Sequence, residues 1–233
     1  LVQIHIGGRG GKVLDAGTNG DIEQLQRAIR LAVERGAASH IMISHDDATP
    51  VLKGDEVGKF ASAAHAHVFV LKTVESYLAA NYPDVGLSFC TPYYHGFGNR
   101  SWSNPEVAAA AREYMDVLHG WRPSRTAIVW TGPRTESFNI TDDDIQSYRN
   151  LVGRDKELFY WDNTWHIYQP LRSFSSAYPE GYVEDCYRRT GFLYINATLP
   201  VGRFFSATAM DYYWNSEGHD PVRARRVAVA RFM

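Results

Sequence analysis

Cysteine and long apolar runs are scarce in this sequence of 233 residues. The two cysteines, Cys90 and Cys186, are too few for a disulfide framework, and no CxxC or Cys/His ligand spacing surrounds them, so we expect both thiols to be reduced. No apolar run approaches the roughly 20 residues that span a bilayer. The net charge of −2 gives no general electrostatic reason to bind nucleic acid or an anionic membrane. We therefore expect neither of these as a partner.

The signatures of several reaction classes are absent as well. The nine histidines form no HExxH or comparable ligand set, and no GxSxG nucleophile motif occurs. The segment "GGRGG" (Gly7 to Gly11) lacks the spacing of a phosphate-binding or dinucleotide-binding loop, and we interpret it as a tight turn above a strand. The sequence thus predicts no metal and no cofactor.

The first residues, "LVQIHIGG", lack the basic region and the cleavage site of a signal peptide. They have the pattern of a strand already in progress, so we expect the sequence to start inside a longer protein. The three N-x-S/T sequons, at Asn99, Asn139 and Asn196, are few enough to occur by chance. The sequence fits a secreted protein and a cytoplasmic one equally.

The dominant pattern is an alternation of short apolar runs with longer helical segments. Helical spacing or helix-start signals occur at residues 21–36, 56–81, 104–120 and 141–153, and a final helical segment in two pieces is expected from Phe204 onward. The apolar runs lie at residues 2–8, 40–44, 86–90, 126–130, 157–161 and 191–196. Six strand–helix units of this kind predict an α/β fold with a parallel sheet. The runs are nearly continuously apolar, which is typical of strands buried on both faces.

Polar and aromatic residues follow every predicted strand, in the segments "GGRGG", "HDD", "CTPYY", "WTGP", "WDN" and "NAT". A doubly wound sheet and a (β/α)8 barrel both fit the alternation. A barrel builds its site from the ends of all its strands, whereas an open sheet binds ligands at one switch point. The pattern therefore favours a (β/α)8 TIM-type barrel in one domain over residues 1–233. The first two βα units are then absent from this sequence or from the protein.

Two adjacent carboxylates, Asp46 and Asp47, follow the apolar run "IMIS". One interpretation is a solvated acidic turn or a helix cap. The other is a catalytic pair, because both side chains can turn into one pocket where a strand ends. Two like charges this close resist both being ionised, so one carboxyl can keep its proton near neutral pH. Cleavage of a glycosidic bond needs one protonated and one ionised carboxyl group.

Other charged and aromatic segments have simpler interpretations. The acids of "TDDDI" (Thr141 to Ile145) stand at a predicted helix start, where they complement the helix dipole. The basic segment "RARRVAVAR" is interpreted as a solvated helix face. The tryptophans of "VWTGP" and "YWDNTW" serve either for packing or as flat platforms for a sugar ring, beside asparagines that can both donate and accept hydrogen bonds.

The order of these motifs resembles the catalytic barrel of glycoside hydrolase family 84, the β-N-acetylglucosaminidases that include O-GlcNAcase and hyaluronidase-like bacterial enzymes. "ISHDDATP" is similar to the family's strand that ends in Asp-Asp, and "FCTPYY" to its Cys-Pro-Thr-x-Tyr. "VWTGP" is almost unchanged, "YWDN" matches Trp-Asp-Asn, and "GFLYIN" is near Gly-x-Leu-x-Asn. "TAMDYYWNSEGHDPVRA" resembles the helix after the last strand. The resemblance covers nearly the whole chain and implies that it comprises barrel strands three to eight, because Asp-Asp closes the fourth strand in the family.

The resemblance also implies substrate-assisted catalysis, an exception to the usual scheme of two catalytic carboxylates. The 2-acetamido oxygen of the substrate would attack the anomeric carbon and form an oxazoline. Asp46 would orient and polarise the acetamido N–H. Asp47 would protonate the departing glycosidic oxygen and then deprotonate the incoming water. The anomeric configuration would be retained.

By the same resemblance, Tyr94 would hydrogen-bond near the acetamido group, Trp161 would form a pocket wall, and Asn163 and Asn196 would hold the carboxylate pair and the sugar. The chain departs from the family at Ile167 and Tyr168, which occupy the place of an Asn-Asp pair that binds the sugar's outer hydroxyls. Tyr168 offers at best a single phenol there, so we expect weaker binding of a terminal N-acetylglucosamine or a different preference at that end of the sugar. The segment "NATLPVG" also lacks the acidic residue that the family has after its last strand.

Three functional hypotheses follow. The leading one is a retaining β-N-acetylhexosaminidase that acts on a glycan or a glycosylated protein without a cofactor. The second is a degenerate barrel that binds a sugar or another partner without cleaving it. The third is an unrelated barrel enzyme, which would cleave β-glucosides that lack an acetamido group. Substitution of Asp47 separates the first two, and oligomerisation that completes an open barrel is compatible with each.

Overall fold

The computed structural model describes residues 1–7, 14–96, 105–137, 140–163, 192–195, 218 and 220–232, with the backbone alone for 192–195, 221, 225 and 232. The chain divides into two compact units. The first comprises Leu1–Tyr94, Ser101–Val129 and Tyr148–Leu158, and the second comprises His95–Arg100, Trp130–Ser147 and Phe159–Met233. Among the described residues, no helix combines the length and the apolar composition needed to cross a membrane.

The first unit is built on parallel strands in sequential order. Strand β1 (Val2–His5) pairs with β2 (His40–Ser44), β2 pairs with β3 (Gly86–Cys90), and β3 pairs with β4 (Thr126–Trp130), all in parallel. The predicted strands at these positions are therefore confirmed. Because the strands are parallel and in register, their carboxyl ends meet at one edge of the sheet.

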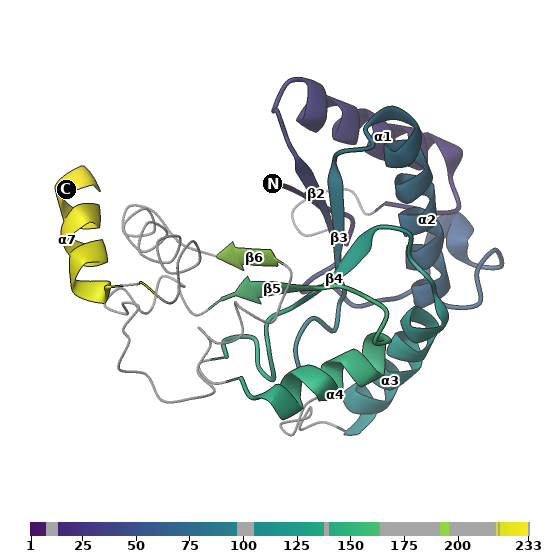
Figure 1. Cartoon of the computed structure of the whole chain (residues 1–233). Coiled ribbons are helices and arrows are strands. Elements are labelled where there is room, and N and C mark those ends of the chain that lie inside the picture. The colour runs from purple at the N-terminus through teal and green to yellow at the C-terminus, as the bar shows by residue number, and fades with distance from the viewer. Residues whose placement is uncertain are drawn as a thin grey trace. The chain divides into compact units, whose positions relative to one another are not determined.

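Helices connect these strands on one side of the sheet. Helix α1 (Asn19–Glu34) follows β1, α2 (Ala63–Asn81) follows β2, and α3 (Pro105–Gly120) follows β3. Figure 1 shows the three helices on the same side of the strands, where α2 packs against both α1 and α3. Right-handed crossovers between strands in sequential order put every helix on one face, whereas a doubly wound sheet reverses its order and covers both faces.

The core of the first unit lies between the strands and these helices. The side chains of Ile41 and Ile43 on β2 and of Phe89 on β3 are fully buried. From the helices, Ile29, Leu71, Leu78, Met115 and Leu118 complete the core. Helix α1 turns Leu25 and Ile29 inward, four residues apart, as its predicted amphipathic spacing requires.

The helix predicted from Glu56 onward begins only at Ala63, so the predicted start was wrong. A short 3-10 helix, η1 (Gly54–Glu56), precedes it. Gly54 and Gly58 have φ angles of +50° and +87°, which a right-handed helix cannot contain. The carboxylate of Glu56 is buried and accepts backbone N–H groups of Ala16 at 2.9 Å and of Lys53 at 3.0 Å. These contacts hold the segment as an irregular loop.

A buried glutamate ties α2 to the start of β4. The Oε1 atom of Glu75 accepts the backbone N–H groups of Ser124, Arg125 and Thr126, each at 3.1 Å, and the hydroxyl of Thr126 at 2.7 Å. One side-chain oxygen therefore satisfies the backbone donors of the turn that leads into the strand.

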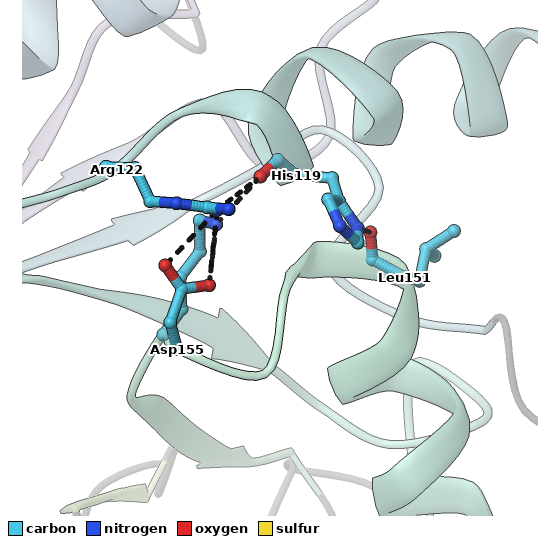
Figure 2. Close-up of polar contacts among 5 residues, drawn as sticks. His119, Arg122, Leu151 and Asp155 are labelled. Atoms are coloured by element: carbon cyan, nitrogen blue, oxygen red, sulfur yellow. Dashed lines mark hydrogen bonds and ion pairs between the residues drawn. The ribbon is translucent and has the colours of Figure 1, made fainter.

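The amino-terminal ends of β4 and of β5 (Leu158–Asp162) are joined by a polar cluster (Figure 2). The guanidinium of Arg122 donates to the carbonyl of His119 at 3.1 Å and lies 3.2 Å from the carboxylate of Asp155. The ring of His119 contacts the carbonyl of Leu151 at 3.1 Å, so Nδ1 carries the hydrogen. Lys156 donates to the same His119 carbonyl. The cluster lies at the amino-terminal ends of strands, whereas Asp46 and Asp47 follow the carboxyl end of β2.

The second unit contains the parallel pair of β5 and β6 (Phe192–Ile195), most of helix α4 (Asp142–Val152) and α7 (Pro221–Phe232). Helix α4 begins as predicted, because Thr141 Oγ1 accepts the N–H of Asp144 at 3.2 Å and Asp144 accepts the N–H of Thr141 at 3.0 Å. The acids of this segment thus have a structural role. On α7 the described arginines are exposed, as expected for a solvated face.

Candidate active site

The predicted acidic pair lies where β2 ends, and its two members have different surroundings. Ser44, His45 and Asp46 are buried, and Asp46 is only 4% exposed. Asp47 is exposed and has a φ of +55°, in the left-handed region. The backbone therefore turns sharply at Asp47. Its side chain no longer follows the strand pattern, in which successive side chains point to opposite faces. One carboxylate lies inside the unit and the next lies at its surface.

Oδ1 of Asp46 has two polar neighbours on two strands. The hydroxyl of Ser44, two residues earlier on β2, donates to this oxygen. On β1, Nδ1 of His5 lies 3.1 Å from the same oxygen. The side-chain amide of Gln3 donates to Ser44 Oγ at 3.0 Å. The register pairs His5 with Ser44, so β1 presents this polar edge directly beside the buried carboxylate.

Asp47 is held by a tyrosine from the end of the neighbouring strand. The hydroxyl of Tyr94 donates to Asp47 Oδ1 at 2.8 Å. Burial raises the pKa of Tyr94, and the hydrogen bond to Asp47 and the charges of Asp47 and Asp46 raise it further. The phenol therefore stays protonated and acts as a donor, and both carboxylates lie within its electrostatic reach.

Cys90 ends β3 beneath the pair and is a free, fully buried thiol, as its predicted reduced state requires. Burial raises its pKa, and the charges of Asp46 and Asp47 act in the same direction. A thiol with a raised pKa carries little thiolate, so Cys90 is unsuited to be a nucleophile. Cys186 lies outside the described residues.

Two neutral imidazoles pack behind the acidic pair. The rings of His45 and His67 have centroids 4.2 Å apart, and His67 Nδ1 lies 2.5 Å from the hydroxyl of Tyr114. Burial lowers the pKa of both histidines, so each ring is uncharged at neutral pH. They support the turn by packing and bring no positive charge to the carboxylates.

The loop after Asp47 is fastened to the loop before α1. Asp55 donates its backbone N–H to Asp15 at 2.8 Å, and the ammonium of Lys59 donates to the carbonyl of Gly17. A Cβ atom on Gly17 would stand 2.5 Å from the backbone carbon of Asp55, so the two loops approach as closely as glycine allows. With the Glu56–Ala16 bond, these contacts fix the loop that follows Asp47.

The other predicted site residues belong to the second unit or are not described. Trp161 on β5 is 6% exposed, Asp162 is fully buried, and Asn163 directly after the strand is half-buried. These residues form the carboxyl end of β5, as predicted. Asn196 and Tyr168 lie outside the described residues. The structure thus brings Asp46, Asp47 and Tyr94 together within the first unit.

Sequence reasoning missed Gln3, His5 and Ser44. A signal was present, because Gln3 and His5 alternate with Val2, Ile4 and Ile6 in a strand that is otherwise apolar. Polar residues two apart share one face of a strand. Within the residues that the structure describes, no group of three or more His, Cys, Asp or Glu side chains could hold a metal ion.

Comparison with known proteins supplies the family. A profile of the β-N-acetylglucosaminidase family matches residues 11–233. Among solved structures, an O-GlcNAc hydrolase from Thermobaculum terrenum, in an aspartate-to-asparagine mutant form, is similar in fold, with a TM-score of 0.71 and 20% identity. The similarity covers 99% of this chain and 47% of that one, so the chain spans about half the length of its structural relative. No curated protein matches. Because the family profile covers nearly all its residues, the chain belongs to the β-N-acetylglucosaminidase family, glycoside hydrolase family 84.

Proposed function

We propose that the chain is the catalytic part of a retaining β-N-acetylglucosaminidase that uses the substrate's own acetamido group as nucleophile. The observation that carries this proposal is the unequal environment of two consecutive carboxylates: Asp46 is buried beside Ser44 and His5, and Asp47 is exposed and bound by Tyr94. One carboxylate is thus held as a fixed acceptor, and the other can reach a leaving group and water.

In the proposed reaction, Asp46 accepts the acetamido N–H and increases the electron density on the acetamido oxygen. That oxygen attacks the anomeric carbon as the glycosidic bond breaks, and Asp47 gives its proton to the departing oxygen. The product is a protonated oxazoline, whose N–H stays hydrogen-bonded to Asp46, and the leaving alcohol is released. Asp47 then takes a proton from a water molecule that opens the oxazoline at the anomeric carbon. Two displacements at one carbon retain its configuration.

The same proposal includes the fold and the sugar contacts. The sequential parallel order and the helices on one face of the first unit support a (β/α)8 barrel, for which this chain would supply strands three to eight in a single domain. Trp161, Asn163 and Asn196 would contact the sugar from later strand ends. Tyr168 would meet its outer hydroxyls, and the substrate would be a glycan or a glycosylated protein.

The test is release of an aryl alcohol from aryl β-N-acetylglucosaminides by the full-length protein and by its Asp47→Asn variant. We expect turnover by the parent and a loss in the variant that grows as the leaving group becomes poorer, because only poor leaving groups need protonation. Asp116→Asn, a change at an exposed carboxylate on α3, is the matched control and should keep full activity.

Two results would contradict the proposal. If the parent binds N-acetylglucosamine without turnover and Asp47→Asn binds it equally well, the protein is a sugar-binding barrel. If the parent cleaves aryl β-glucosides as fast as the acetamido substrates, the acetamido group is not the nucleophile.

A further inference from the structure

Strand β1 carries two polar side chains that contact the end of β2 and the buried carboxylate that follows it. Gln3 and His5 are two residues apart, so they share one face of the strand. Ser44 is the last residue of β2, and the register places His5 beside it; Asp46 follows two residues later in the turn after the strand. Gln3 is half-buried and His5 is exposed, so burial alone does not require either side chain to make these contacts. Their partners here are Ser44 and Asp46.

Both polar neighbours of Asp46 act on the same oxygen. Ser44 donates to Oδ1, and His5 Nδ1 lies 3.1 Å from Oδ1. Among the described residues, no side chain or backbone group bonds to Oδ2. A carboxylate that is free to rotate about its Cβ–Cγ bond exchanges its two oxygens. Donors from two different strands on one oxygen oppose that rotation.

We propose that His5 is a positioning residue that holds Oδ1 of Asp46, together with Ser44, and thereby presents Oδ2 to the acetamido N–H of the substrate. This inference rests on the proposed function. A carboxylate only accepts hydrogen bonds, so His5 contributes Nδ1 with its hydrogen. Gln3 acts one step further away, because its amide binds Ser44 Oγ and directs the serine hydrogen toward Asp46.

The geometry of the imidazole suggests variants that either keep or remove the hydrogen-bond donor at the position of Nδ1. Asparagine places its side-chain nitrogen where histidine has Nδ1, whereas glutamine places its nitrogen near the position of Nε2. His5→Asn should therefore keep the contact to Asp46, and His5→Gln should lose it. His5→Leu removes the donor and puts an apolar side chain of similar size in its place.

We expect kcat/KM for an aryl β-N-acetylglucosaminide to fall about tenfold or more in His5→Leu and His5→Gln, as for the loss of a hydrogen bond to a charged group. His5→Asn should retain activity within about threefold of the parent. The loss in His5→Leu should be the same for good and poor leaving groups, because it acts through Asp46 and not through Asp47. His65→Leu, at an exposed histidine on α2, is the control for the substitution itself.

A double-mutant cycle separates positioning from a general loss of structure. If His5 acts through Asp46, then His5→Leu should cost little activity in an Asp46→Asn background, because the group that it positions has already been changed. Full activity of His5→Leu in an active parent would overturn the role of His5 alone. So would a loss that is undiminished in the Asp46→Asn background, or failure of His5→Asn to restore activity. A parent without turnover would overturn the proposed function, and this inference with it.

Discussion

The hydroxyl of Tyr94 donates a hydrogen bond of 2.8 Å to Oδ1 of Asp47, although the two residues are 47 positions apart in the chain. Adjacent parallel strands make this contact. β2 and β3 end side by side, and the N–H of His45 continues the ladder to the carbonyl of Cys90 at 2.9 Å. The residues that follow the two strands therefore meet, and the tyrosine becomes a fixed partner of the carboxylate.

We expect Tyr94→Phe to lower kcat/KM by about tenfold, because a hydrogen bond to a charged carboxylate is worth about 1.5–3 kcal/mol. The loss should be greater for poor leaving groups, since the affected carboxylate is the proposed acid. Steady-state kinetics with a series of aryl substrates measures it. Tyr77→Phe, which removes a hydroxyl from α2, serves as the control. Equal losses of kcat/KM in both variants would show that the Tyr94 hydroxyl has no specific role in the reaction.

The left-handed backbone at Asp47 gives a prediction on stability. Asparagine tolerates a positive φ, whereas a β-branched residue does not, so we expect the free energy of unfolding to be lower in Asp47→Val than in Asp47→Asn by about 1–2 kcal/mol or more. Urea denaturation of both variants tests the difference. Thr49→Val, an exposed position in the same loop, controls for the introduced side chain. Equal stability of the Asp47→Val and Asp47→Asn variants would show that the turn relaxes.

Buried histidines predict a loss of stability in acid. Burial lowers the pKa of His40 from 6.5 to about 4, and it lowers those of His45 and His67 in the same direction. Below pH 6.5 these histidines are therefore protonated to a greater extent in the unfolded chain than in the folded chain. The free energy of unfolding should be highest above this pH and fall toward pH 4, by at most about 1.4 kcal/mol per pH unit for each such histidine.

The His40→Gln variant should show a shallower fall between pH 7 and pH 5 in urea titrations, whatever its stability at neutral pH. Its side chain can still reach Ser88, whose hydroxyl lies 3.0 Å from Nε2 of His40. His65→Gln changes an exposed histidine and should leave the slope as it is. An unchanged slope in His40→Gln would assign the acid sensitivity to other groups.

Glu75 should be among the most sensitive positions of the first unit. Its Oε1 accepts three backbone N–H groups and one hydroxyl, so Glu75→Ala leaves several donors without an acceptor near the start of β4. We expect a loss of about 3 kcal/mol or more in the free energy of unfolding. Asp116→Ala, at an exposed position on α3, should change it by less than about 0.5 kcal/mol. Comparable values for the two variants would contradict the assigned role.

The sequence predicted the strands well because each is a short, continuous apolar run between turn residues, as "HIMIS" and "TAIVW" illustrate. It also placed Asp46 and Asp47 at a strand end. The start of α2 was predicted too early, because the positive φ angles at Gly54 and Gly58 interrupt a pattern that spacing alone continues. The unequal exposure of the two acids depends on the φ of Asp47, which no local pattern reveals.

The partnership of His5 with Asp46 was beyond prediction for a different reason. It depends on the register between two strands whose sequences lie about 40 residues apart, and a shift by one residue would turn His5 to the other face. The local sequence indicates that β1 has a polar face. Only the pairing of the strands shows that this face contacts Ser44 and Asp46.

The fastened loop that follows Asp47 has a consequence for the thermodynamics of the proposed sugar binding. The loop after Asp47 is already held by Glu56, Asp55 and Lys59 before any sugar arrives. A ligand that binds there does not have to order this segment, so less conformational entropy is lost on association. On this side of the site, affinity should respond to changes in the sugar's own groups far more than to changes that stiffen the loop.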